Sequence, residues 1–149
     1  MTYPDDELEA ALLDGWATLM AAQIPGLFYS ADPAVPYPAD RVGIYVDRYP
    51  ETEQPSISLT DYVVSDDVSD NGDDVVGVQA MIWHQDRDEL RKIRGQLRSL
   101  FHRRGRTTLS GVTLVLATRE SGTNVGQDEN GRQGRTENYY ATVSRYATN

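Results

Sequence analysis

Residues 75–105 read VVGVQAMIWHQDRDELRKIRGQLRSLFHRRG and contain the clearest strand and the clearest helix of the chain. In the first ten of these residues, successive side chains point to opposite faces if the segment is extended, and each face carries apolar residues. A strand with two partly apolar faces is typical of the middle of a sheet, where both faces are covered. We therefore expect residues 75–84 to form the central strand.

The second half of this stretch has the spacing of an amphipathic helix. Asp86 is a suitable N-cap, Glu89 follows in the first turn, and Gly105 is a suitable end. At about 100° per residue, five apolar side chains fall within about a third of the helix circumference. They are Leu90, Ile93, Leu97, Leu100 and Phe101. The pattern predicts a helix over residues 86–104 that buries this stripe against the central strand.

Another helix is predicted near the start of the chain. It begins at residue 5 and ends before Pro25 and Gly26, which stop helices. Its expected apolar face consists of Leu8, Ala11, Leu12, Gly15 and Leu19. Residues 27–40 are rich in proline, so we expect an extended connection without regular structure there.

Four further strands complete the prediction, at residues 42–49, 56–64, 110–120 and 136–146, where β-branched and aromatic residues are frequent. Loops are expected at residues 65–74 and 121–136, which are rich in Asp, Asn and Gly. The whole chain, residues 1–149, is then a single domain of the α+β class. It should contain one mixed β-sheet of about four to five strands with two main helices packed on it.

The charge of the chain is sorted along its length. The net charge is −9, yet residues 1–86 hold 17 acidic and two basic residues, while residues 87–119 hold nine basic and two acidic residues. So acidic a chain lacks the broad basic footprint of a duplex DNA-binding protein. The chain has no cysteine, no basic signal peptide and no apolar run of about 18 residues, so we expect no thiolate metal site and no membrane partner.

Two acidic segments resemble parts of a calcium-binding loop, in which oxygen ligands alternate around a turn glycine. The first match consists of Asp67, Ser69, Asn71, Gly72 and Asp73. Its twelfth position, which should supply a bidentate carboxylate, is Val78. The second match consists of Asp128, Asn130, Gly131 and Glu137, but its first position is Gly126. Because each lacks a required ligand, we interpret both as solvated turns without a metal.

The two histidines do not complete a catalytic set either. His84 and Asp86 form an H-x-D triplet at a strand end, and His102 is predicted on the exposed side of the second helix. No serine elbow, H-E-x-x-H motif or phosphate loop accompanies them. We therefore expect no catalytic residue, no cofactor and no enzyme activity. The alternative is a small metal-dependent or acid–base enzyme that uses His84, Asp86 and the acidic segment 67–74.

Four arginines lie along one border of the apolar stripe of the second helix. We call Arg87, Arg91, Arg94 and Arg98 the arginine row. The row can pair with acidic residues of its own chain, contact nucleic acid, or meet the acidic surface of another copy of the chain. The net charge makes duplex DNA the weakest of these partners. An acidic side and a basic edge on one subunit suit head-to-tail packing, which can close into a ring. The row is therefore predicted to be a subunit interface.

The order of features over residues 5–146 also carries a family resemblance. A first helix ends in IPG, the extended VGIYVDRYPE follows, and after the acidic segment comes the strand and helix of residues 75–104, then two closing strands around a long loop. This order resembles that of the tail terminator proteins of long-tailed bacteriophages, also labelled minor tail or minor capsid proteins.

The resemblance implies a structural protein of the virion rather than an enzyme. Six copies would form a homohexameric ring that caps the tail tube protein, ends its polymerisation and meets the head-completion proteins of the neck. Genomic DNA would pass through the ring without specific binding, and the ring would assemble in the host cytoplasm and remain at the head–tail junction. The related alternative is another neck protein. Native mass separates a ring of six from a compact, calcium-binding monomer.

Overall fold

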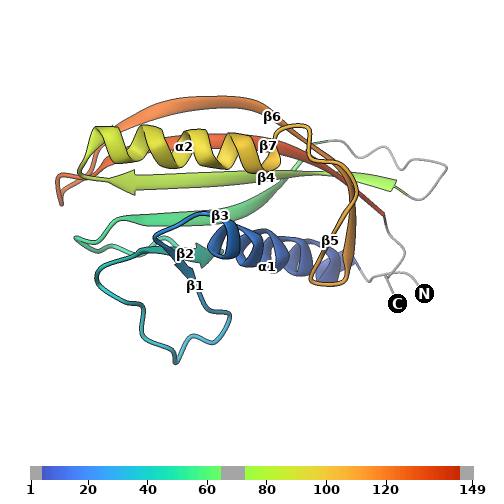
Figure 1. Ribbon diagram of the computed structural model, residues 1–149, viewed down its shortest axis with the longest axis horizontal. Helices are drawn as coiled ribbons and strands as arrows, with labels where there is room; N and C mark the ends of the chain where they lie inside the picture. Colours follow the sequence, from blue (N-terminus) through green and yellow to red (C-terminus); the bar gives the residue numbers. More distant parts are fainter. Residues whose placement is uncertain (1–4, 65–72, 145–149) are drawn as a thin grey trace.

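The computed structural model describes residues 5–64 and 73–144 of the chain. Two helices and seven strands follow one another along these residues (Figure 1). In chain order they are α1 (Asp5–Gln23), β1 (Leu27–Tyr29), β2 (Val42–Val46), β3 (Ser56–Val63), β4 (Asp73–His84), α2 (Arg87–Phe101), β5 (Thr107–Leu109), β6 (Val112–Gln127) and β7 (Gln133–Ser144).

The strands pair in one curled sheet in the order β1-β2-β3-β4-β7-β6-β5. β1, β2 and β3 are parallel to one another, and every later neighbouring pair is antiparallel. β4 takes the central place that its two apolar faces predict. The mixed sheet with two helices therefore agrees with the expectation, but the predicted number of four to five strands is wrong, because the sheet has seven.

The error in strand number has a physical reason at each place. β1 and β5 have only three residues each, too few to show an alternating pattern. The predicted loop over residues 121–136 is also wrong, because β6 continues to Gln127 and β7 begins at Gln133. The outer part of β6 is exposed, so no apolar alternation marks it as a strand. Its backbone ladder with β7, from Ser121 opposite Asn138 onward, holds it extended.

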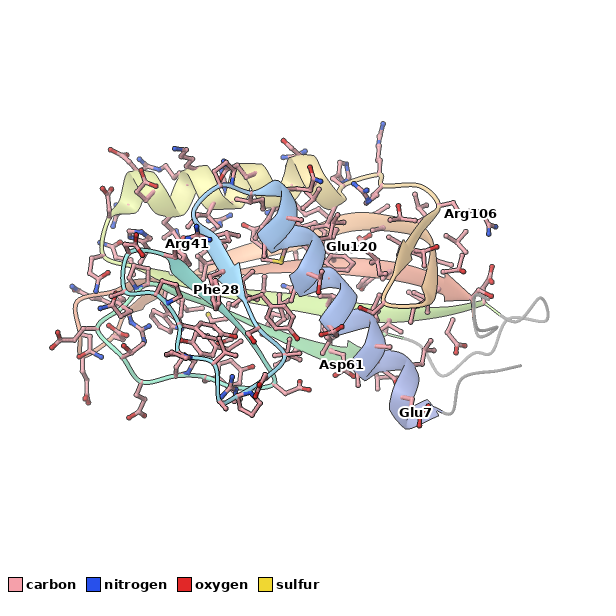
Figure 2. The ribbon with its side chains drawn as sticks, turned by 60° about the horizontal axis from the view of Figure 1, so that its bottom comes forward. Glu7, Phe28, Arg41, Asp61, Arg106 and Glu120 are labelled. Carbon is pink, nitrogen blue, oxygen red and sulfur yellow. The ribbon has the colours of Figure 1, made fainter. Side chains whose placement is uncertain are left out.

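Both helices cover the same face of the sheet (Figure 1). In Figure 2, α1 runs obliquely across the strands, whereas α2 runs more nearly along them. Trp16 of α1 stacks on Phe101 of α2 with their ring centroids 3.8 Å apart, and Tyr139 of β7 meets both rings edge-on. Such ring pairs contribute about 0.5–1.5 kcal/mol beyond the area they bury. These three buried side chains join the helices and the sheet in one core.

α2 confirms most of the predicted stripe. Four of its five residues are buried and Leu100 is partly buried; the buried residues are Leu90, Ile93, Leu97 and Phe101. The Asp86 carboxylate accepts hydrogen bonds from the backbone N–H groups of Asp88 and Glu89, at 2.9 and 3.4 Å, and so caps the helix. The predicted end at Gly105 is wrong. Helix α2 stops at Phe101, and Arg103 already has a positive φ of 61°, which turns the chain before the glycine.

α1 buries a wider face than the predicted one. Leu8, Leu12 and Gly15 are buried as expected, while Ala11 and Leu19 are only partly buried. The residues that the pattern missed are Leu13, Trp16, Ala17 and Met20, all fully buried. Gly15 allows α1 to approach β5, because a Cβ there would lie 2.5 Å from the backbone of Leu109. Neither α1 nor α2 has the length and apolar character needed to span a bilayer.

Candidate functional site

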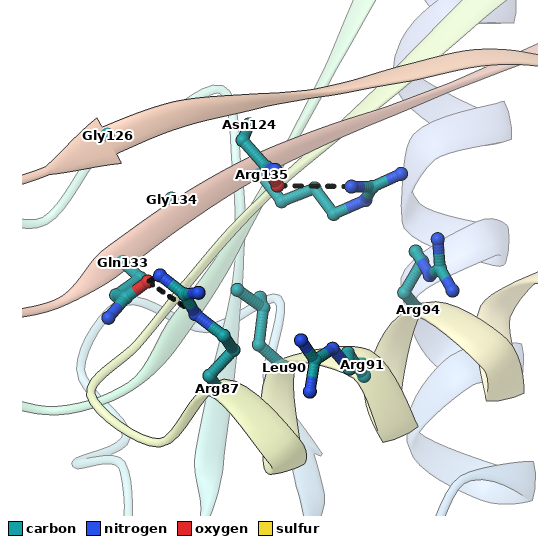
Figure 3. A pocket seen from close by; sticks show the side chains of 9 residues that line it. All are labelled: Arg87, Leu90, Arg91, Arg94, Asn124, Gly126, Gln133, Gly134 and Arg135. Carbon is teal, nitrogen blue, oxygen red and sulfur yellow. Dashed lines mark hydrogen bonds between the residues drawn. The ribbon is translucent and has the colours of Figure 1, made fainter.

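Three residues of the arginine row border a cleft between α2 and the β6–β7 hairpin (Figure 3). We call it the arginine cleft; its volume is about 230 Å³. It is lined by Arg87, Leu90, Arg91, Arg94, Asn124, Gly126, Gln133, Gly134 and Arg135. Spacings of four and three residues put the first three arginines of the row on one side of α2, where they face the hairpin. The fourth, Arg98, is exposed and does not line the cleft.

The opposite wall of the cleft carries a fourth guanidinium group, that of Arg135 on β7. Its Nε donates a hydrogen bond to Glu137 Oε1 at 2.6 Å, and its Nη1 donates one to Asn124 Oδ1 at 3.0 Å. Glu137 is completely buried, and its other oxygen, Oε2, accepts a hydrogen bond from Arg119 Nε at 2.6 Å. One buried carboxylate thus holds two arginines from neighbouring strands in fixed positions.

The ion pair of Glu137 lies directly against Gly122. A Cβ at position 122 would lie 2.8 Å from Glu137 Oε1 and 2.7 Å from Arg119 Nη2. The hydrogen bond to Glu137 raises the pKa of Arg119, although burial acts in the opposite direction. Arg119 therefore stays charged, and the one buried carboxylate of Glu137 is shared between Arg119 and Arg135.

The arginines of α2 differ in their partners. Arg87 donates two hydrogen bonds to the neutral Gln133 Oε1, from Nε at 3.1 Å and from Nη2 at 2.8 Å. Arg91 forms an exposed ion pair with Asp88 at 3.1 Å. Within residues 5–64 and 73–144, Arg94 and Arg98 make no ion pair or hydrogen bond through their guanidinium groups, and Arg94 is half-buried. The cleft is therefore rich in guanidinium donors and poor in carboxylates, which suits an anion.

Structural contacts occupy the histidines and the capping carboxylate that the sequence offered for catalysis. His84 Nδ1 accepts a hydrogen bond from the backbone N–H of Asp86 at 3.0 Å, while the Asp86 carboxylate caps α2. Burial lowers the pKa of His84, although Glu89 and Asp86 act in the opposite direction. His102 was predicted to be exposed, which is wrong. It is half-buried, because its Nδ1 accepts a hydrogen bond from the backbone N–H of Arg119 at 3.0 Å.

The two acidic segments do not come together as a metal site in the described part of the chain. The first falls mostly on residues 65–72, outside the described residues, and Asp73 begins β4. In the second, Asp128 accepts hydrogen bonds from the backbone N–H groups of Asn130 and Arg132, while Glu137 is bound by Arg119 and Arg135. Among the described residues, no three His, Asp or Glu side chains are grouped to hold a metal ion.

A buried arginine fixes the turn between β6 and β7. Arg132 donates hydrogen bonds to Asp128 Oδ2 at 2.7 Å, to the Gln54 carbonyl at 2.9 Å and to Ser56 Oγ at 3.0 Å, and it lies over the ring of Trp83. Burial raises the pKa of Asp128, but its hydrogen bonds with Arg132 outweigh this and lower it overall. The turn is thereby tied to the start of β3, which holds the hairpin wall of the cleft in place.

Sequence reasoning found three of the four cleft arginines and missed Arg135, Asn124 and Gln133. These three residues fall in the segment predicted to be a loop, so the pattern gave no face on which to place them. One signal was present in the sequence. Arg135 directly precedes the strand predicted over residues 136–146, and an earlier start of that strand would have placed it on the same face as Glu137 and Tyr139.

Comparisons with known proteins do not assign the chain to a family. The sequence matches no model of a known protein family, and it matches no curated protein.

Proposed function

We propose that this protein is a tail terminator of a long-tailed bacteriophage. In this role six copies form a ring that caps the tail tube, ends its polymerisation and joins the tail to the head-completion proteins. The order of sequence features supports the proposal. The structural observation that carries it is a stretch of strand edge on β6 that no described strand pairs with, close to α2, the helix that carries the arginine row (Figure 1).

The outer side of β6 is covered only near its beginning. β5 pairs with Val112–Leu114, a bridge from Arg104 reaches Ala117, and His102 accepts the backbone N–H of Arg119. Beyond these contacts, residues 120–127 have β7 on one side and no described strand on the other. Open strand edges readily pair with another chain, so most proteins shorten or cover them. We infer that a neighbouring copy covers this edge in the assembly.

A ring requires that two different surfaces of the same chain meet. The other edge of the sheet, β1, is a different surface from the β6 edge, so a contact between the two is heterologous. Charge favours the same arrangement, because the acidic residues are concentrated in residues 1–86 and the basic residues in 87–119. Arg94 and Arg98 are the members of the row whose guanidinium groups have no partner in the described chain. They are the two that we expect to face the acidic part of the neighbour.

The first experiment measures the mass of the assembly by sedimentation and native mass spectrometry. We expect six copies at low salt and partial dissociation at high salt, because exposed charge pairs are screened over about 8 Å at physiological ionic strength. A closed dimer would contradict the ring, since pairing of two β6 edges with each other is a two-fold contact. A monomer at every salt and protein concentration would also contradict it.

The second experiment tests the interface by charge reversal. The double variant Arg94→Glu/Arg98→Glu should form monomers instead of rings. These monomers should be folded, with the same circular dichroism spectrum as the parent. The matched control is Arg103→Glu with Arg106→Glu, which changes the net charge equally at two exposed positions beyond α2. If both double variants dissociate equally, net charge is responsible and the row is not the interface. An unchanged ring in the Arg94/Arg98 variant would also remove the row from the interface.

A further inference from the structure

We propose that the arginine cleft is a binding site for a multivalent oxyanion of the phosphate class. Every residue that the proposal uses belongs to one subunit, so the site exists without assembly; of these residues, Arg94 is also assigned to the subunit interface and Arg135 is not. The proposal rests on three features of the cleft: an excess of positive charge, the fixed orientation of two of the guanidinium groups, and a volume that suits such an anion (Figure 3).

The charge excess follows from the partners of each arginine. Of the cleft arginines, Arg91 bonds to the carboxylate of Asp88 and Arg135 to that of Glu137, which Arg119 also shares. Arg87 bonds to a neutral amide, and Arg94 has no anion beside it in the described chain. Five guanidinium groups thus share two carboxylates, in a chain whose net charge is −9. Charges of one sign repel one another, most strongly where water is partly excluded, as at the half-buried Arg94 and Arg135, and a bound anion removes that repulsion.

The orientation of two of the guanidinium groups is set before any ligand arrives. Arg87 is held by two hydrogen bonds to Gln133, and Arg135 is held by Glu137 and Asn124. A guanidinium group offers five N–H donors in a rigid plane, so further donors remain on each side chain. Donors from α2 and from β7 border one space, and the several oxygens of a phosphate group can accept from both walls. Preorganised donors of this kind strengthen binding, because little side-chain freedom is lost.

The volume and the charge together select the class of anion. A cleft of about 230 Å³ is several times the volume of roughly 30 Å³ that one water molecule takes up, so a chloride ion leaves most of it filled with water. A single carboxylate carries one negative charge, which is less than the charge excess of the cleft. Pyrophosphate or a phosphate ester carries two or more charges and several acceptor oxygens, and arginine binds such groups through paired hydrogen bonds.

The test is calorimetric titration of the full chain with pyrophosphate, with sodium chloride at the same ionic strength as the reference. We expect saturable binding of one pyrophosphate per subunit, and weaker binding of inorganic phosphate. Arg94→Gln and Arg135→Gln should each lower the affinity at least tenfold. The matched control is Arg106→Gln, which removes the same charge from an exposed position beyond the far end of α2 (Figure 2) and should bind like the parent.

Further measurements identify the source of the phosphate group and check that each variant is folded. A nucleoside diphosphate that binds more tightly than pyrophosphate would show that the natural ligand is a phosphate ester, and the reverse would favour a free anion. Arg94→Lys keeps the charge but loses the planar donor pair, so it should bind less tightly than the parent and more tightly than Arg94→Gln. Circular dichroism and thermal unfolding of each variant without ligand check that it is folded.

Three outcomes would overturn the proposal. The first is heat that chloride reproduces at equal ionic strength, because this is nonspecific screening. The second is equal loss of affinity in the Arg94→Gln and Arg106→Gln variants, because the site is then not the cleft. The third is tighter binding of oligoglutamate than of pyrophosphate, because the cleft then recognises carboxylates. Arg135 lies outside the arginine row, so Arg135→Gln separates loss of the anion from loss of the ring.

Discussion

The two ends of α2 have chemically different surroundings, aromatic at one end and charged at the other. At the C-terminal end, Phe101 is fully buried and stacks on Trp16 above Tyr139. At the N-terminal end, the helix borders the arginine cleft, and the sheet beneath it carries the buried carboxylate of Glu137 between two guanidinium groups. The same sheet strand, β7, supplies both Tyr139 and Glu137.

This difference indicates a division of roles between the two ends of α2. Apolar contacts of the kind found at Phe101 are not directional and contribute in proportion to the area they bury. A buried ion pair contributes less to stability, because desolvation of the charges offsets much of their attraction. We therefore expect the aromatic end to hold the fold together and the charged end to hold donors in place. The following predictions test that division, beginning with the largest effect.

Phe101→Ala should lower the free energy of unfolding by about 3–5 kcal/mol, because it removes a buried ring and leaves a cavity between the two helices and β7. Urea denaturation of the parent and the variant measures the difference. Ser99→Ala, at an exposed position two residues earlier on the same helix, should change stability by less than about 0.5 kcal/mol. A loss below 1 kcal/mol for Phe101→Ala would mean that the aromatic cluster is not the main support of α2.

Glu137→Gln should have a smaller effect, of about 1.5–3 kcal/mol, the range measured for hydrogen bonds to charged groups. The loss is limited because the side chains of Arg119 and Arg135 are 21% and 17% exposed, so water can reach them when the carboxylate is gone. The exposed Glu129→Gln, in the turn of the same hairpin, is the control for the loss of one negative charge. If Glu137→Gln cost more than Phe101→Ala under identical conditions, the proposed division along α2 would be reversed.

The smallest effect is expected from protonation of His84, next to the N-terminal end of α2. Because its pKa is lowered, the unfolded chain takes up a proton below about pH 6.5 more readily than the folded chain does. Stability from this residue is therefore complete above that pH and is lost as the pH falls toward the lowered pKa. Protonation also removes Nδ1 as the acceptor for the Asp86 N–H.

The measurement for His84 compares denaturation of the parent and of His84→Gln at pH 8 and at pH 5.5. The parent should lose more stability between the two pH values than the variant does. The comparison within each protein cancels any effect of the substitution that does not depend on pH. Equal losses in both proteins would show that His84 does not contribute to the acid sensitivity of the fold.

The sequence predicted those parts of the fold in which apolar side chains alternate or repeat with a helical period. The stripe of α2, the Asp86 cap and the central position of β4 follow from such patterns, because burial of one face requires them. The outer part of β6 could not be predicted in this way. Its strand is set by the backbone ladder with β7 and by polar pairs such as Asn124 with Arg135, which have no characteristic spacing in one sequence.

Only one of the two walls of the candidate site was predicted, for the same reason. Helical spacing placed Arg87, Arg91 and Arg94 together, since residues three and four apart share a side of a helix. The other wall consists of residues 30 or more positions later in the chain, and only the sheet topology brings Arg135 opposite them. The buried carboxylate of Glu137 was read as a partial calcium ligand, because sequence alone does not show which charge lies next to it in space.

The position of β7 has a consequence for the order in which the molecule can be built during synthesis. β7 is last in the chain among the described strands, yet it lies between β4 and β6. While the ribosome is still translating residues before 133, β4 has an exposed inner edge and Tyr139 is missing from the aromatic core. The nascent chain therefore has no complete sheet to release, and its open edges are the kind that aggregate or recruit chaperones. Pairing between strands far apart in the sequence also slows folding after release. We therefore expect each subunit to complete its own sheet before it pairs with another copy.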